Sequence, residues 1–347
     1  MRLSEFDYEL PNELIAQFPI KPRENANLLD ASSSQIFDKH VYNLPDLINS
    51  NDILIVNNTK VLPSKLLGRI KNKDIIVTLH KNTSQNTWLA FSKPSKLLQN
   101  GDCIIFDGFE GIVIEKLDFG EIEIDFDISY SGFINKLTKI GQMPLPPYIK
   151  RKNIRNEDFD DYQTNFSSKI GSVASPTAGL HFSKKLISDL SLKKIKISEI
   201  TLHIGAGTFL PIRSNDINHH VMHYEWGELS QKVVNDIIKC KKNGGRVIAV
   251  GTTTLRMLET AFQNQNKLVP FSGSTNLFIK PGFDIKTVDL LLTNFHMPKS
   301  TLFILVSTFS GVDKIKKIYN HAIQKKYRFF SYGDCCLLRN SNETFSI

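Results

Sequence analysis

The stretch QKVVNDIIKCKKNGGRVIAVGTTTLRMLETAFQ, residues Gln231 to Gln263, decides the fold class. Its first part has apolar residues at helical spacing and ends at Gly244 and Gly245, which predicts a helix with a glycine stop. The run RVIAVG that follows predicts a buried strand, and the threonines after it begin a second helix. This order of elements is typical of an α/β protein, in which helices cover a sheet.

The flanking sequence continues the same alternation. KIKISEITLH (194–203) predicts a strand, as does DLLLTNF (289–295), and STLFILVSTF (300–309) predicts a buried helix. The region from about 64 to 128 differs, because short apolar runs alternate there with Asn, Gly and Asp turns. So many short strands in a small region predict a small barrel or sandwich. A proline-rich connector, GQMPLPPYIKR (141–151), follows it.

These patterns predict two domains. We expect an α/β domain built from residues 1–60 and 146–347, interrupted by an inserted all-β domain at 61–145. No apolar run is long enough to cross a membrane, and the N-terminus lacks the pattern of a signal peptide. We therefore expect a cytoplasmic protein that does not enter the membrane.

The charge balance points to an anionic partner. The chain of 347 residues has a formal net charge of +8, for which nucleic acid is the commonest large partner. The lysines are spread along the sequence, so a solvated basic surface is the competing interpretation. The four cysteines show no CxxC spacing and are expected to be small buried residues.

Four of the nine histidines fall in TLHIGAGTFLPIRSNDINHHVMHYEW (201–226). His219 and His223 could share one helical face and form half of a zinc site, but HExxH is absent and no other ligands are evident. The same stretch could instead cradle a phosphate or line the pocket of another ligand. The metal, phosphate and ligand-pocket interpretations all remain open from the residues alone.

Other candidate site residues follow strands. The helix start in VIAVGTTTLRMLE could hold a phosphate or carboxylate, or its threonines could simply cap the helix. This segment lacks both GxGxxG and GxxxxGK[ST], which argues against a dinucleotide or P-loop site. His181, His296 and Lys299 lie in loops after strand ends, where α/β proteins gather their chemistry. GxSxG is absent, which argues against a serine hydrolase.

Taken together and in order, these motifs resemble one family, the S-adenosylmethionine:tRNA ribosyltransferase-isomerases of queuosine biosynthesis (the QueA family). Small departures from the family pattern are Asn58, Lys60, Ser175 and Met297. Because Asn58 replaces a carboxylate, we assign it no acid–base role. The resemblance extends from Phe6 to Asp334 and rests on FDYELPNELIAQFP, VNNTKVLPSKLLGR, GQMPLPPYIKR, SPTAGLHF, TLHIGAGTFLP, HHVMHYEW, VGTTTLRMLE, TNFHMPKST and YRFFSYGD.

The resemblance implies an unusual reaction. S-adenosylmethionine serves as the donor of a ribosyl group, and the acceptor is an aminomethyl-deazaguanine at the wobble position of tRNA. The products are epoxyqueuosine in tRNA, adenine and methionine. The implied fold is a barrel-like α/β domain with a smaller inserted β-barrel. No metal is expected, and we expect a monomer.

The implied chemistry suggests roles for particular residues. A base must remove a proton from the ribose 5′ carbon, and an acid must help adenine to leave. Candidates for proton transfer are His181, His203, His223, Glu225 and Asp334. Candidates for binding S-adenosylmethionine are Gly205, Ala206, Gly207, Thr252, Thr253 and Thr254. Candidates for contact with the tRNA backbone are Arg151, Arg256, Lys299 and Arg328.

Three alternatives stay open. The chain could be a non-catalytic tRNA-binding protein, although simple binding does not need so many His and Gly-Thr turns at strand ends. It could be an ordinary methyltransferase, although the usual Gly-rich loop after an early strand is absent. It could also be a zinc hydrolase that uses His219 and His223.

Overall fold

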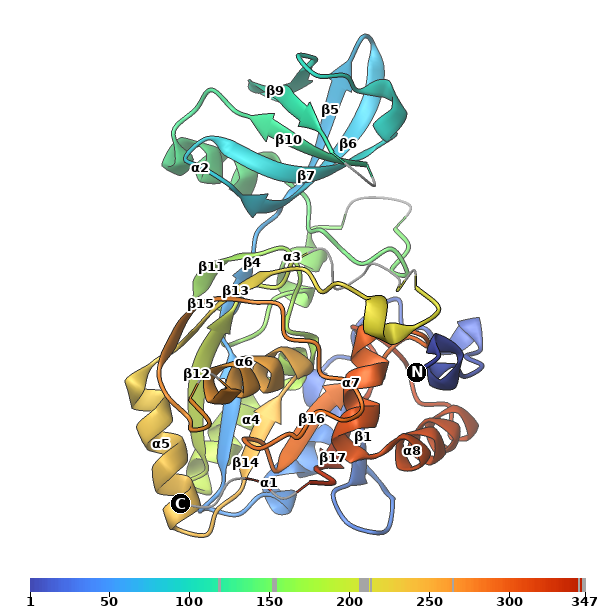
Figure 1. Ribbon diagram of the computed structural model, residues 1–347, viewed down its shortest axis with the longest axis vertical. Helices are drawn as coiled ribbons and strands as arrows, with labels where there is room; N and C mark the ends of the chain where they lie inside the picture. The colour runs from blue at the N-terminus through green and yellow to red at the C-terminus, as the bar shows by residue number, and fades with distance from the viewer. Residues whose placement is uncertain are drawn as a thin grey trace.

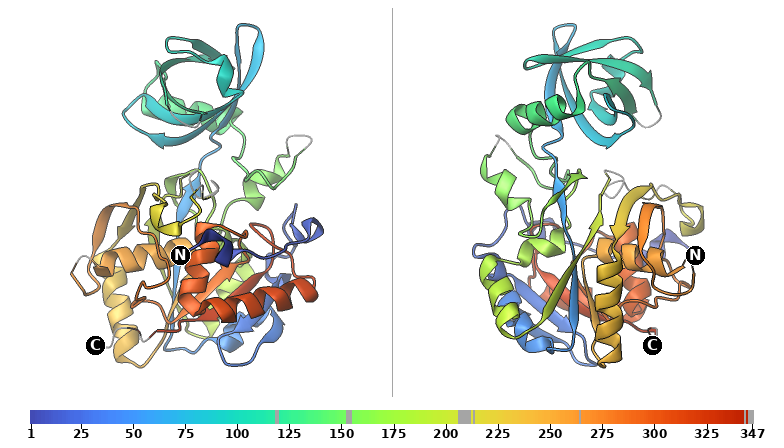
Figure 2. Two further views of the ribbon diagram at one scale, coloured as in Figure 1. Left: turned by 45° about the vertical axis from the view of Figure 1, so that its right-hand side comes forward. Right: turned by 90° about the vertical axis from the view of Figure 1, so that its left-hand side faces the viewer.

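The computed structural model describes residues 1–117, 120–151, 155–205, 212, 214–263, 265–342 and 344. A small barrel stands above a larger α/β domain (Figures 1 and 2). The inserted barrel and the α/β class are both confirmed. Among the described residues, no helix has the length and apolar character that crossing a bilayer requires.

A nine-stranded sheet forms the centre of the α/β domain, with β15 and β2 as its two edge strands. Its four central strands β12, β3, β14 and β16 run parallel to one another. Their carboxyl ends therefore meet at one edge of the sheet, where α/β proteins place their ligand sites. In spatial order the strands are β15 (Phe271–Thr275), β13 (Glu225–Leu229), β12 (Lys196–Leu202), β3 (Ile53–Asn57), β14 (Val247–Val250), β16 (Leu290–Asn294), β17 (Cys335–Arg339), β1 (Asn27–Ala31) and β2 (Phe37–His40).

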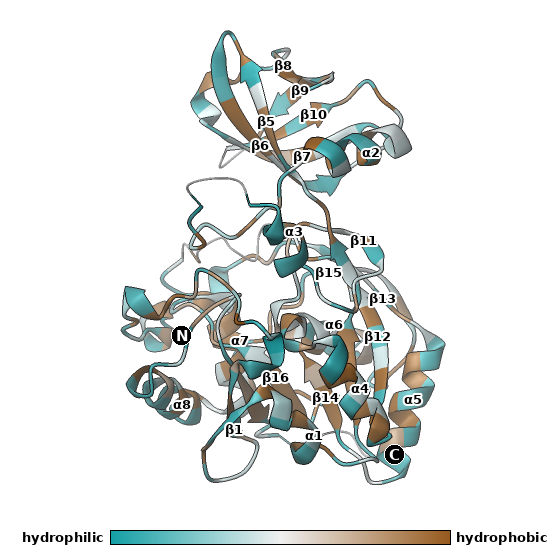
Figure 3. Ribbon diagram, turned by 180° about the vertical axis from the view of Figure 1, so that it is seen from behind, coloured by the Kyte–Doolittle hydropathy of each residue, from teal (hydrophilic) through white to brown (hydrophobic). Residues whose placement is uncertain are grey.

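Each face of this sheet has its own apolar core. Within β3, Ile53 and Ile55 contribute to one core, while Leu54 and Val56 contribute to the other. This alternation follows from the period of two along a strand, and it explains why β14, which is buried on both faces, is apolar throughout (Figure 3). The first core is covered by α5 (Gln231–Lys242), α6 (Thr252–Gln263), α7 (Thr301–Ser310) and α8 (Val312–Gln324), and the second by α1 (Leu44–Leu47) and α4 (Lys184–Leu192).

The helices predicted around β14 form as expected. Ser230 caps α5, since its side chain accepts a hydrogen bond from the backbone N–H of Val233. The chain then leaves α5 through Gly244, whose φ of +70° favours glycine. Within the described ranges, short 3-10 helices lie between the larger elements at Leu3–Phe6, Asn12–Leu14, Arg23–Asn25, Val41–Asn43, Ser95–Leu97, Thr177–His181 and Ile217–His219.

The inserted domain is a closed antiparallel barrel of six strands. Its interior is apolar, and helix α2 (Tyr130–Ile140) adds Phe133 and Leu137 to that core. Closure removes the exposed edges that an open sheet of this size would have. Around the barrel the order is β10 (Glu121–Asp125), β7 (Thr87–Lys93), β6 (Lys73–Asn82), β5 (Lys65–Ile70), β8 (Cys103–Phe106) and β9 (Phe109–Lys116).

The two chain segments that connect the domains lie side by side. The N–H of Lys65 donates to the carbonyl of Gln142 at 3.1 Å, and the N–H of Gln142 donates back to Lys65 at 2.8 Å. We propose that 61–145 remains the best limit for the inserted domain, because this exchange joins its two ends. On the α/β side, β4 (Thr59–Val61) pairs in parallel with β11 (Lys169–Ser172), and α3 (Glu157–Asp161) lies nearby.

Candidate active site

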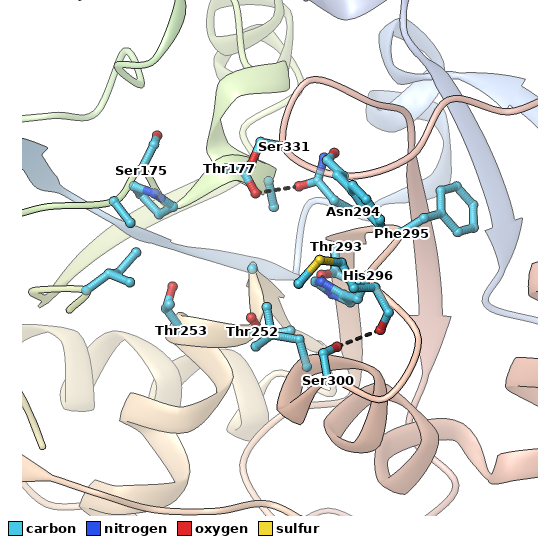
Figure 4. A pocket seen from close by; sticks show the side chains of 18 of the residues that line it. Ser175, Thr177, Thr252, Thr253, Thr293, Asn294, Phe295, His296, Ser300 and Ser331 are labelled. Atoms are coloured by element: carbon cyan, nitrogen blue, oxygen red, sulfur yellow. Dashed lines mark hydrogen bonds between the residues drawn. The ribbon is translucent and has the colours of Figure 1, made fainter. Parts of the chain in front are cut away.

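A pocket lies at the carboxyl edge of the parallel strands, and Figure 4 shows it from close by. We call it the central pocket. Five segments and the proline-rich connector supply its walls, so parts of the chain that are far apart in the sequence converge on it. It is lined by Tyr148, Ala174 to Ala178, Ile204, Gly251 to Thr253, Thr293 to Met297, Ser300, Leu302, Phe330 and Ser331.

The start of α6 forms one wall of the central pocket. Gly251 turns the chain with a φ of +91°, and Thr252 and Thr253 follow it into the pocket. The Thr253 hydroxyl is buried and has no hydrogen-bond partner within the described part of the chain. Thr254 differs from its predicted role, because its hydroxyl donates to the carbonyl of Val250, at the end of β14, at 2.8 Å. We therefore remove Thr254 from the binding residues.

Asn294 joins the loops that surround the pocket. Its side-chain oxygen accepts a hydrogen bond from the Thr177 hydroxyl at 2.9 Å (Figure 4). Its amide nitrogen lies 3.3 Å from Nε2 of His181 and donates to the carbonyl of Phe330 at 3.2 Å. A buried amide with these partners fixes three loops relative to one another. Nothing in the local pattern TNFHMPKST distinguishes this asparagine as a site residue.

His296 is the histidine that lines the central pocket. Its Nε2 lies 2.9 Å from the Thr293 hydroxyl, and burial lowers its pKa to about 3. Its backbone is held by two tyrosines: its N–H donates to the Tyr319 hydroxyl at 3.0 Å, and Tyr8 donates to its carbonyl. The imidazole is therefore neutral near pH 7 and fixed in place. The sequence predicts His296 only as a loop histidine after a strand, and its place in the pocket is what distinguishes it.

His181 and Asp334 lie behind the pocket wall. Burial lowers the pKa of His181 to about 4, opposed by the charge of Asp334. Asp334 is fully buried and accepts hydrogen bonds from the N–H groups of Asn27 at 3.0 Å and Arg328 at 2.8 Å. A carboxylate committed to these backbone groups braces the loop, so we correct its predicted role in proton transfer to a structural one.

His203 sits at the end of β12 in a tight environment. Its Nδ1 lies 2.8 Å from the Thr59 hydroxyl, and its ring stacks on Trp226 with a centroid distance of 5.4 Å. Burial lowers its pKa. A Cβ atom on Gly171 would come within 2.7 Å of this ring, which explains the glycine at that position. His203 is thus a positioned neutral imidazole outside the wall of the central pocket.

A second, smaller pocket adjoins the central one, and Leu302 lines both. We call it the side pocket; Glu225 and Arg256 form its buried end, with an ion-pair distance of 2.6 Å. Glu225 also accepts a hydrogen bond from the N–H of Gly205 at 3.1 Å. The lining residues are His220, Met222, His223, Glu225, Arg256, Thr301 and Leu302.

Arg256 differs from its predicted contact with the tRNA backbone. Its side chain is only 4% exposed and pairs with Glu225, so a phosphate on the protein surface cannot reach it. His223 is exposed and close enough to the barrel to help lower the pKa of Glu121, which depends mainly on a hydrogen bond from His80. Ala206 and Gly207 lie outside the described residues.

The other three cationic candidates are near the surface, and each has an acidic partner. Arg151 makes two 2.9 Å hydrogen bonds to Asp158, and Lys299 lies 2.6 Å from Asp7 with about half of its side chain exposed. Arg328 is 3.4 Å from Asp334. Lys299 keeps the greatest freedom to meet a phosphate.

The aromatic residues of the central pocket suit a cationic nucleoside. Tyr148 and Phe330 have ring centroids 4.7 Å apart, and the Tyr148 hydroxyl lies 2.7 Å from that of Ser331. Burial raises the pKa of Tyr148 to about 12, so its phenol remains protonated. Aromatic faces attract a sulfonium ion, and hydroxyl groups can bind ribose. Among the described residues, no group of three or more His, Cys, Asp and Glu is arranged to hold a metal ion.

Comparisons with known proteins match nearly the whole length of the chain. The family model described as queuosine biosynthesis protein matches residues 3–338. The chain belongs to the queuosine biosynthesis protein family.

Relatives within this family are similar over nearly their whole length. The S-adenosylmethionine:tRNA ribosyltransferase-isomerase of Methylocella silvestris is 44% identical over 352 residues, covering 97% of this chain and 98% of the relative. The protein of the same name from Allorhizobium ampelinum is 43% identical, with 97% and 99% covered. The crystal structure of a S-adenosylmethionine tRNA ribosyltransferase from Thermotoga maritima is 30% identical, with a TM-score of 0.55 and coverage of 96% and 99%.

Two departures from the family pattern lie in the central pocket. Ser175 and Met297 both line it, and the Ser175 hydroxyl is buried without a partner in the described region. Asn58 is elsewhere and accepts a hydrogen bond from the Thr201 hydroxyl at 2.8 Å. Its structural role agrees with the absence of an acid–base assignment.

Proposed function

We propose that this chain is an S-adenosylmethionine:tRNA ribosyltransferase-isomerase. The observation that carries the proposal is its identity of 43–44% with enzymes of that name over 97% of the chain. The reaction moves the ribosyl group of S-adenosylmethionine to the aminomethyl-deazaguanine at the wobble position of tRNA. The modified tRNA then carries epoxyqueuosine, and adenine and methionine are released.

The central pocket is the proposed site of the nucleoside and its sulfonium. Tyr148 and Phe330 offer aromatic faces to the positive charge, and the hydroxyls of Thr252 and Thr253 can accept or donate hydrogen bonds to the ligand. The buried, unpartnered hydroxyl of Thr253 supports this assignment, because such a group is expensive to bury unless a ligand satisfies it.

Proton transfer requires a neutral base close to the ribose. His296 meets this requirement best, because it lines the pocket and burial keeps its imidazole neutral. Phosphates of a bound tRNA would raise its pKa towards the working range, since nearby negative charge favours the protonated form. His181 remains a proposed partner through Asn294, and His203 and His223 remain candidates for later proton steps.

These buried and positioned histidines favour catalysis over the alternative of a non-catalytic tRNA-binding protein. A surface that only binds RNA has no need for neutral imidazoles buried beside a pocket. The tRNA substrate also favours a cytoplasmic location. For the tRNA backbone we keep Lys299, Arg151 and Arg328 as proposed contacts, with Lys299 first because of its exposure.

A product assay tests the proposal. The protein is mixed with S-adenosylmethionine and tRNA that carries the aminomethyl-deazaguanine, and adenine, methionine and S-adenosylhomocysteine are quantified. We expect adenine and methionine in equal amounts, formed only with that tRNA. Formation of S-adenosylhomocysteine would indicate methyl transfer instead, and tRNA binding without any turnover would favour the non-catalytic alternative.

A further inference from the structure

Arg256 has a feature that its ion pair does not explain. Its Nη1 donates to Glu225 at 2.6 Å and its Nε donates to the carbonyl of Leu277 at 3.2 Å. Its Nη2 is buried and has no hydrogen-bond partner among the described residues, although the side chain is only 4% exposed. A buried guanidinium N–H without a partner costs free energy, and this one belongs to a residue that lines the side pocket.

We propose that the side pocket binds the amino-acid end of S-adenosylmethionine, with Arg256 Nη2 donating to its carboxylate. The proposal rests on the proposed function and adds to it the subsite for one half of the donor. A guanidinium with one free Nη and a fixed orientation is well suited to a carboxylate. The ligand would supply the missing acceptor.

The charges of the side pocket match a zwitterion. Arg256 and Glu225 together are neutral, so a bound group that carries both an ammonium and a carboxylate leaves the buried site neutral as well. The carboxylate would lie against Arg256, and the ammonium would lie on the side of Glu225. Met222 and Leu302 supply apolar contacts for the methylene groups between the head and the sulfonium.

The two pockets are adjacent in a way that one extended ligand can use. Thr252, Thr253 and Arg256 lie on one face of α6, since residues three and four apart are neighbours on a helix. The start of α7 also joins the two pockets. Ser300 lines the central pocket, the next residue Thr301 lines the side pocket, and Leu302 lines both. A nucleoside in the central pocket can therefore extend its methionine chain into the side pocket.

The start of α6 is the rival site for the carboxylate, because its free N–H groups also favour an anion. The unpartnered Nη2 of Arg256 distinguishes the two possibilities. A carboxylate at the helix start would leave Arg256 Nη2 unsatisfied, whereas a carboxylate in the side pocket satisfies it and leaves Thr252 and Thr253 for the ribose hydroxyls.

The experiment compares S-adenosylmethionine with its decarboxylated form, which lacks only the carboxylate. Dissociation constants are measured by calorimetry in the presence of tRNA with unmodified guanine at the wobble position, which lacks the aminomethyl group that accepts the ribosyl group. We expect the wild-type protein to bind the decarboxylated form about 10- to 100-fold more weakly. In Arg256→Lys, which keeps the charge but loses the planar fork, this ratio should fall below about 5-fold.

Two further variants make the result specific. Arg246 forms an ion pair with Asp52 at the same 2.6 Å distance, but it lies outside both pockets, so Arg246→Lys should keep the wild-type ratio. Thr253→Val should weaken the binding of both ligands equally. If Arg256→Lys does not fold, Glu225→Gln combined with Arg256→Gln removes both charges and should also abolish the ratio.

The proposal is overturned if the wild-type protein binds both ligands equally, if Arg256→Lys keeps the full ratio, or if Thr253→Val abolishes it. These outcomes are separate from a failure of the proposed function. That failure would appear as a lack of tRNA-dependent adenine release, and the binding measurement does not depend on turnover.

Discussion

Single side chains in this protein owe their chemistry to burial. His181 and His296 are almost fully buried, and desolvation lowers their pKa values to about 4 and about 3. Both therefore remain neutral in the folded state at pH values where the unfolded chain is protonated. The same burial leaves the hydroxyls of Ser175 and Thr253 without partners beside the central pocket.

The two histidines make stability depend on pH. Their folded pKa values lie below the unfolded value of about 6.5, so between about pH 4 and 6.5 the unfolded state binds more protons. Stability from these groups is fully present above pH 6.5 and decreases as the pH falls. From pH 7 to pH 5 we expect a loss of about 2 kcal/mol for each histidine, measured as the free energy of unfolding in urea.

Substitution separates this contribution from that of the carboxylates. His181→Asn or His296→Asn should each reduce the difference in unfolding free energy between pH 7 and pH 5 by about 2 kcal/mol. An unfolding free energy that is the same at both pH values in the wild-type protein would show that the buried imidazoles are not responsible.

Thr253 and Thr254 are neighbours with opposite expected behaviour. Thr253→Val removes a buried hydroxyl without a partner, so we expect a gain in stability of about 1 kcal/mol and weaker binding of S-adenosylmethionine by about 5- to 10-fold. Thr254→Val removes a hydroxyl that already donates to the carbonyl of Val250 at the end of β14, so binding should remain within about 2-fold. Thermal unfolding and calorimetry measure both effects, and equal losses of binding in the two variants would contradict the assignment.

Among the elements, the ends of the parallel strands define the site, and the two segments that connect the domains join the barrel to the α/β domain. β12, β14 and β16 end at the same edge and lead into the loops that line the central pocket. At the base of the barrel, Lys65 exchanges two backbone hydrogen bonds with Gln142, which follows shortly after the end of α2. The chain is packed closely at this point, because Gly141 lies against the backbone of Pro63.

Substitutions of two glycines near the ends of α2 test how closely the two connecting segments pack. A Cβ atom on Gly141 would lie 1.9 Å from the Pro63 carbonyl oxygen, so Gly141→Ala must push the two segments apart. We expect a loss of more than about 2 kcal/mol in the free energy of unfolding. Gly132→Ala on the same helix meets only side-chain atoms, at 3.1 Å or more, and should stay within about 1 kcal/mol of wild type. If Gly141→Ala is as stable as Gly132→Ala, the contact between Gly141 and Pro63 is not tightly packed.

At the scale of the whole molecule, the proposed tRNA and S-adenosylmethionine sites depend on different physical properties. The net charge of +8 acts over the surface, whereas the central pocket is lined mostly by apolar and hydroxyl side chains. Salt screens the first effect and has little influence on the second, because ion release accompanies only the neutralisation of phosphates.

The two substrates should therefore respond differently to salt. For about four phosphate contacts, raising the salt from about 50 to 200 mM should weaken tRNA binding by about 50- to 150-fold. The dissociation constant of S-adenosylmethionine should change by less than about 2-fold over the same range. Lys299→Gln should reduce the salt slope for tRNA by roughly one contact. A tRNA affinity that is independent of salt would contradict an electrostatic RNA surface.

The sequence by itself determined the α/β class, the inserted barrel and the family. Helical and strand periods are local properties, so Gln231–Gln263 predicted α5, β14 and α6 without knowledge of their neighbours. The same local information placed Thr252 and Thr253 at a helix start and His296 in a loop after a strand.

Only the tertiary structure decided which of these residues face a ligand. Asp334 and Arg256 have the residue types of a catalytic acid and an RNA contact, but folding commits Asp334 to backbone N–H groups and places Arg256 in the wall of the side pocket, away from the surface. Asn294 and Tyr148 entered the site because segments distant in sequence pack together there. Burial and partnership depend on contacts between remote segments, and a local pattern contains no information about them.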